Sequence, residues 1–155
     1  MSAQESALHL DTLAAIPDQL EAAVREAGAG APSAAGAEWT PSEIAGHLGD
    51  AARYLGARMR RVVREQEPAL PLFDENTMVE LAAYRYRDLD ELLAVFRLTS
   101  AGNVAFLRAL PADAWERAGH HEVRGPLTLR EIVAIESAHE QAHARQFREA
   151  LGLGG

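Results

Sequence analysis

The chain has 155 residues, of which 48% are hydrophobic and 25% charged, a composition typical of a single globular domain. Its formal net charge of −8 argues against a nucleic-acid partner, and the lack of cysteine excludes disulfides, thiolate metal ligands and a cysteine nucleophile. No apolar run approaches the roughly 20 residues that a membrane span needs, and the N-terminal segment does not have the pattern of a signal peptide. We therefore expect one cytoplasmic domain over residues 1–155, with no membrane partner.

The first predicted helix runs from about Gln4 to Ala27. Pro17 lies inside it, so a kink or a restart is expected there. A connection rich in small residues follows over residues 28–39. The helix is indicated by apolar residues at three- and four-residue spacing: Leu13, Ile16, Leu20 and Val24.

The second predicted helix begins at the sequence TPSE. Thr40 can cap it, Pro41 suits its first position, and Glu43 completes a capping box. An apolar stripe then extends the helix to about Gln66. The stripe consists of Ile44, Leu48, Ala51, Leu55, Met59 and Val62.

A long, proline-marked segment follows, in which a short helix is expected over residues 75–84. The third long helix is predicted from Asp88, which forms a capping pattern with Glu91, to about Leu110. The fourth is predicted from the capping box of Thr128 to Leu151, where the sequence GLGG ends it.

No run alternates clearly between apolar and polar residues, so strands are not expected. Four long helices predict an all-α four-helix bundle. The long segment between the second and third helices predicts a crossover, and therefore a topology other than simple up-down-up-down.

The fourth helix contains the sequence HEQAH, formed by residues 139–143. His139 and His143 are four residues apart, so their side chains share one helix face and can point at a single ion. The sequence matches the H-E-x-x-H pattern of zinc proteases, but the extended form of that motif needs Gly and His where this chain has Gln146 and Glu149. No strand pattern that could hold an extended peptide precedes it, so we reject the protease interpretation and expect no role for Glu140 as a base.

A third ligand would have to come from another helix, and His47 is the best candidate. It lies between Ile44 and Leu48 and therefore points inward, although a buried, hydrogen-bonded histidine is the alternative. Three histidines with open positions are typical of catalytic rather than structural metal sites. Asp50 and Glu136 share the helix faces of His47 and His139, and each either orients its histidine or is a surface charge.

The remaining histidines are weaker candidates. His120 and His121 are expected on an exposed loop that could shape a pocket mouth, and His9 is expected at the surface. Asn103 and Arg97 of the third long helix are polar residues that could line a pocket.

Taken in order, the fragments WTPSEIAGHLGD, LPADAWERAGHH and GPLTLREIVAIESAHEQAHARQF resemble the DinB/YfiT-like superfamily over nearly the whole chain. The resemblance implies a four-helix bundle of up-down-down-up topology. It also implies a divalent metal ion (zinc, nickel, iron or manganese) held by His47, His139 and His143, and a homodimer as a common state. Characterised relatives include S-transferases that use the thiols bacillithiol or mycothiol, and a thiol-dependent maleylpyruvate isomerase.

Three hypotheses for function follow. The leading one is a metal-dependent enzyme with a small-molecule substrate that uses a low-molecular-weight thiol for S-transfer, because the chain has no cysteine nucleophile of its own. The second is a hydrolase with the same three ligands and a metal-activated water. The third is a protein without turnover: a metal-binding, stress-associated protein or a structural bundle whose histidines belong to the core.

Overall fold

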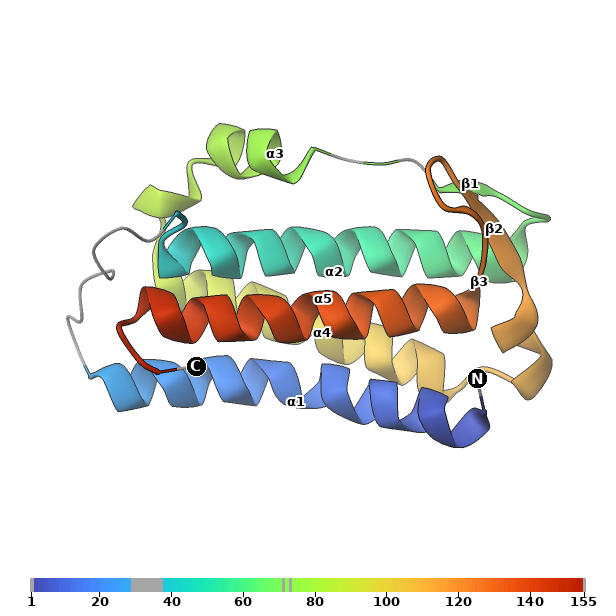
Figure 1. Cartoon of the computed structure of the whole chain (residues 1–155), viewed down its shortest axis with the longest axis horizontal. Helices are drawn as coiled ribbons and strands as arrows, with labels where there is room; N and C mark the ends of the chain where they lie inside the picture. The colour runs from blue at the N-terminus through green and yellow to red at the C-terminus, as the bar shows by residue number, and fades with distance from the viewer. Residues whose placement is uncertain (1, 29–37, 71, 73, 155) are drawn as a thin grey trace.

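Four long helices lie side by side in the computed structural model, which describes residues 2–28, 38–70, 72 and 74–154 (Figure 1). They are α1 (Ala3–Ala27), α2 (Pro41–Arg64), α4 (Leu89–Arg108) and α5 (Leu129–Ala150). α1 and α5 run in one direction and α2 and α4 in the other, so the order along the chain is up-down-down-up (Figure 1). The predicted all-α bundle is confirmed.

The helix boundaries follow from side chains that cap them. At three N-termini, the cap side chain accepts the backbone N–H three residues on, while the glutamate at that position accepts the N–H of the cap residue. Each pair satisfies two donors that have no partner inside the helix. The pairs are Ser2 with Glu5, Thr40 with Glu43, and Thr128 with Glu131.

α1 continues through Pro17 as one helix, so of the two alternatives expected there, a kink or a restart, the restart does not occur. The reason is burial: Leu13, Ile16 and Leu20 are almost fully buried on both sides of the proline, and their packing holds the helix together. The small-residue connection predicted over residues 28–39 lies outside the described residues except at 28, 38 and 39.

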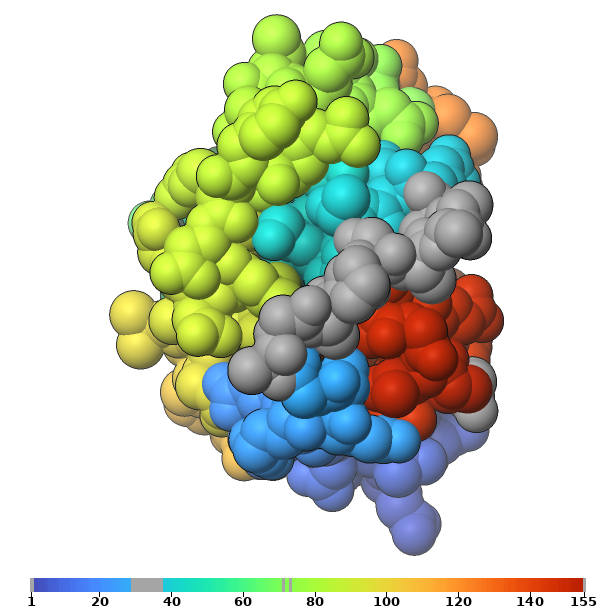
Figure 2. Space-filling view, turned by 90° about the vertical axis from the view of Figure 1, so that its left-hand side faces the viewer, coloured from blue at the N-terminus to red at the C-terminus, as the bar shows by residue number. Residues whose placement is uncertain are grey.

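The crossover between α2 and α4 contains β1 (Ala69–Leu70), the short helix α3 (Glu75–Ala82), which was predicted, and the 3-10 helix η1 (Tyr84–Tyr86). In the end-on view of Figure 2 this segment lies beside the N-terminal end of α2. The ring of Tyr84 packs on Gly46 so closely that a Cβ there would lie 2.3 Å from ring carbons. Glycine at position 46 therefore allows the crossover to lie against α2.

The other end of the bundle carries a three-stranded sheet, so the expectation of no strands is wrong (Figure 1). β2 (Ala118–His121) pairs in parallel with β1 and antiparallel with β3 (Gly125–Thr128). The strands are two to four residues long. A period-two pattern cannot emerge over so few residues, and β1 and β2 are held by partners far apart in the sequence.

The core fills the space between the long helices. Burial of one large apolar side chain contributes about 1.5–3 kcal/mol, and such residues are found along the whole bundle. The largest fully buried side chains include Phe96, Phe147, Ile16, Ile44, Leu48, Met59 and Leu129.

Among the described helices, none is both long and apolar enough to cross a bilayer.

Candidate metal centre

The three histidines singled out from the sequence converge between α2 and α5. His47 lies in the second turn of α2, and its fully buried neighbours Ile44 and Leu48 fix its inward direction. Its Nε2 lies 3.1 Å from Nε2 of His139. The ring of His143 lies one turn further along α5, with its centroid 4.5 Å from the centroids of both other imidazoles.

Glu75 adds a fourth donor that sequence analysis missed. Its Oε2 lies 3.2 Å from Nε2 of His47 and 3.9 Å from Nε2 of His139. One donor atom from each of the four residues lies within 4.8 Å of the other three. Glu75 is the first residue of α3, which Asp74 caps through the backbone N–H of Thr77. The sequence signal that could have pointed to Glu75 was the cap at Asp74, which starts a short helix at Glu75 in the crossover that follows α2.

Neighbouring groups orient the imidazoles from behind. Nδ1 of His139 donates to Oε1 of Glu136 over 3.3 Å, and Nδ1 of His143 donates to Oε1 of Gln146 over 2.7 Å. Each bond places the proton on Nδ1 and leaves the Nε2 lone pair for the cluster. The indole of Trp39 stacks on His143, with ring planes 16° apart.

Burial favours the neutral, metal-binding form of two of the three imidazoles. Burial, together with the charges of His143 and His139, lowers the pKa of His47 to about 3, and burial also lowers that of His143. For His139 burial acts in the same direction, but the hydrogen bond and charge of Glu136 outweigh it and raise the pKa. Metal ligation requires deprotonated nitrogens. Three imidazoles and one carboxylate with converging lone pairs are therefore a donor set that fits a divalent ion.

Asp50 does not orient His47, contrary to one of the two expectations for it. Both of its carboxylate oxygens accept the hydroxyl of Tyr84 at 2.9 Å, and one also pairs with Arg53. The residue is buried and bound to the crossover, so it is not a surface charge either. Its role is to tie η1 to α2.

Glu140 lies outside the donor group. It is 1% exposed, and its Oε2 has no hydrogen-bond partner among the described residues. Burial, with the nearby charge of Glu136, raises its pKa well above the usual carboxyl range. Glu136, not Glu140, is the carboxylate beside His139.

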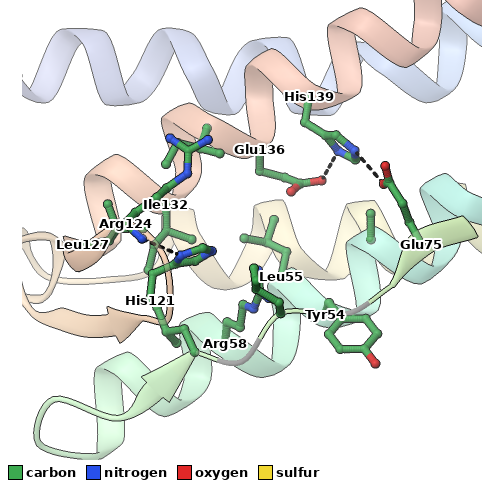
Figure 3. A pocket seen from close by; sticks show the side chains of 14 residues that line it. Tyr54, Leu55, Arg58, Glu75, His121, Arg124, Leu127, Ile132, Glu136 and His139 are labelled. Atoms are coloured by element: carbon green, nitrogen blue, oxygen red, sulfur yellow. Dashed lines mark hydrogen bonds and ion pairs between the residues drawn. The ribbon is translucent and has the colours of Figure 1, made fainter.

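A cavity of about 200 Å³ opens beside the cluster, and His139, Glu75 and Glu136 form part of its wall (Figure 3). His121 lines it from β2, whereas its neighbour His120 is exposed and does not. The loop expected for these two histidines is thus a strand. His9 is half-buried on α1 and does not belong to the donor group.

The two polar residues suggested from the third long helix do not line this cavity. The amide of Asn103 donates to the backbone oxygen of Ala52 over 2.7 Å, and Arg97 pairs with Asp18 and Glu21. α4 packs on α1 and α2, away from the face where α2 and α5 present the histidines, so its polar groups serve packing instead.

Comparison with known proteins agrees with this fold. The chain is similar to YfiT from Bacillus subtilis, described as a probable metal-dependent hydrolase with an unusual four-helix bundle topology. The TM-score is 0.85 at 22% identity, over 99% of this chain and 91% of that one, which shows a common fold. No curated protein matches the chain. The family model of the DinB superfamily matches residues 4–147, and the chain therefore belongs to that superfamily.

Proposed function

We propose that this protein is a metal-dependent enzyme that binds one divalent ion through His47, His139 and His143 and acts on a small molecule in the adjoining cavity. The observation that carries the proposal is the convergence of four donor atoms, within 4.8 Å of one another, at the wall of that cavity. A surface cluster of acids would not be enough to support a metal site. Here, however, His47 is 1% exposed and its lone pair faces two other imidazoles.

The leading reaction is transfer of a low-molecular-weight thiol to an electrophile. The chain has no cysteine, so the sulfur nucleophile has to be supplied by a cosubstrate. A divalent ion in such a site acts as a Lewis acid and lowers the pKa of a thiol or water that binds to it. The imidazoles hold the ion, and Glu75 supplies one oxygen donor from the crossover.

Hydrolysis is the second candidate, favoured by the position of Glu136. Its carboxylate lines the cavity and accepts a hydrogen bond from His139, so it can hold that ligand in place and take up a proton from a water in the cavity. YfiT, which shares the fold, is described as a probable hydrolase.

We further propose that the protein is a cytoplasmic homodimer, which gel filtration and cell fractionation would test.

The metal site is tested by titrating zinc, nickel, iron(II) or manganese into chelator-treated protein. One ion should bind per chain, and at a free concentration 100-fold above Kd it should raise the free energy of unfolding by about 2.7 kcal/mol. His47→Ala, His139→Ala and His143→Ala should remove that gain, whereas His120→Ala, at an exposed position, should keep it. Failure to bind any of the four ions, or an undiminished response in His139→Ala, contradicts the proposal.

Turnover is tested on the metal-loaded protein with two sets of substrates. A panel of small thiols with an electrophilic acceptor should give conjugates only when metal is present. Activated esters without thiol probe hydrolysis, for which Glu136→Gln should reduce kcat strongly. If neither set gives metal-dependent turnover, the enzyme proposal is wrong and a binding protein remains.

A further inference from the structure

The cavity beside the metal centre has an apolar wall that is built from several elements (Figure 3). Leu55 belongs to α2, Leu127 to β3 and Ile132 to α5. Leu55 and Ile132 are buried, so this part of the wall is largely withdrawn from bulk water. Further apolar residues of the wall, among those that the structure describes, are Leu70, Leu72 and Ile135.

The charged side chains that line the same cavity have interactions inside the protein. Glu136 accepts a hydrogen bond from His139 over 3.3 Å. The guanidinium carbon of Arg58 lies 5.9 Å from the centre of the Tyr54 ring, and the nearby carboxylate of Glu136 favours the charged form of the arginine. Arg124 is exposed, so water solvates its charge. A ligand in the cavity therefore does not need a charge of its own to balance these groups.

His121 contributes an uncharged ring to the wall. Its Nδ1 accepts the backbone N–H groups of Val123 at 3.2 Å and Arg124 at 3.0 Å, so the ring proton lies on Nε2. Burial, with the charges of Arg58 and Arg124, lowers the pKa of the ring and favours this neutral form. Away from the donor group, the wall thus offers apolar surface and at most one hydrogen bond from this imidazole.

The volume of the cavity limits the size of an apolar group that can bind there. An apolar protein cavity of about 150 Å³, lined by leucine, isoleucine and phenylalanine, holds one benzene molecule. The cavity here measures about 200 Å³. It therefore has room for a single six-membered ring or a short branched alkyl group. Such a group displaces water that the apolar wall holds weakly, which favours binding.

Building on the proposed function, we propose that the substrate carries a small, uncharged apolar group, such as a phenyl ring or a branched alkyl group, that binds against this wall. The reactive part of the molecule then lies at the donor group, where His139 and Glu75 form part of the same cavity. Leu127 and Ile135, both half-buried, set how large a group is accepted. They act on specificity and take no part in bond making.

The first test measures the binding of fluorobenzene to chelator-treated full-length protein by fluorine NMR. Fluorobenzene should bind saturably at millimolar concentration. It should bind at least about tenfold more tightly than para-fluorobenzoate, whose charge loses hydration at an apolar wall. Absence of saturable binding, or tighter binding of the benzoate, overturns the inference.

Substitutions locate the bound ring. Leu127→Phe and Ile135→Phe fill part of the cavity, and each should weaken fluorobenzene binding at least about tenfold. Leu110→Phe is the matched control: Leu110 is also half-buried and packs against the same apolar cluster as Leu127, but it does not line the cavity. Circular dichroism shows which variants are folded, and either cavity variant alone decides the question. If the folded cavity variants bind fluorobenzene as the control does, the ring lies elsewhere and the inference is wrong.

A second titration, on metal-loaded protein, separates this inference from the proposed function. Benzohydroxamate and acetohydroxamate share a metal-binding group and differ in phenyl against methyl. Benzohydroxamate should bind at least about tenfold more tightly, and Leu127→Phe should remove that preference while Leu110→Phe keeps it. If metal binds but the two hydroxamates bind equally, the inference is wrong and the metal site stands. If no metal binds but fluorobenzene behaves as expected, the apolar site stands and the proposed function fails.

Discussion

His47 couples the stability of the metal-free protein to pH. Burial and two neighbouring imidazoles disfavour the charged ring and lower its pKa from the ordinary value of 6.5 to about 3 in the folded chain. Between these values the unfolded chain binds the proton and the folded chain does not, so falling pH favours unfolding. The contribution of His47 is complete above pH 6.5 and is lost progressively toward pH 3. At pH 5 the two pKa values correspond to a loss of about 2 kcal/mol relative to pH 8.

The assay is urea unfolding of chelator-treated protein at pH 8 and pH 5, for the wild type and for His47→Gln, which cannot titrate there. The free energy of unfolding of the wild type, minus that of the variant, should be about 2 kcal/mol smaller at pH 5 than at pH 8. Both proteins keep His139 and His143, whose pKa shifts arise chiefly from burial and from the hydrogen bonds of Glu136 and Gln146, so the titration of these two rings contributes to both proteins. A difference that is the same at both pH values refutes the argument that His47 is neutral because it is buried.

Three further predictions concern the crossover and a helix cap. Tyr84→Phe removes the hydroxyl that donates to the buried carboxylate of Asp50, and should lower the free energy of unfolding by about 1.5–3 kcal/mol in urea titrations. Gly46→Ala forces a Cβ against the ring of Tyr84 and should cost about 1–3 kcal/mol, whereas Gly49→Ala, whose Cβ meets its nearest atom at 3.9 Å, should be neutral or stabilising; the opposite order would contradict the packing described. Thr128→Ala removes the cap of α5 and should lower the melting temperature by the equivalent of about 1 kcal/mol, while the affinity for metal stays within a few-fold.

The long helices could be predicted because the same local signals that define them in the sequence act in the folded chain. Each capping box is a contact over three residues, and each apolar stripe has the helical period, so no knowledge of distant partners is needed. The convergence of His47 with the two histidines of α5 could also be predicted from the sequence. Side chains that point inward from two neighbouring helices have few places to lie other than against each other.

What could not be predicted depends on contacts between distant segments. β1 and β2 pair across about fifty residues, and nothing local marks either as a strand. Asp50 shares a helix face with His47, but its partner is Tyr84 from the crossover, and only the fold shows that the hydroxyl reaches it. Glu75 joins the donors for the same reason: its position depends on where the crossover lies.

The fourth donor has a consequence for the choice of metal. The three imidazoles belong to helices whose packing defines the core, whereas Glu75 begins a short helix on the outside and is 44% exposed. Replacement of Glu75 therefore leaves the apolar core between the long helices in place and changes the donor set. A carboxylate there suits harder ions, and a thiolate would shift preference toward zinc. In the proposed metal site, the framework that would hold the ion is thus separate from the residue that would set which ion is preferred.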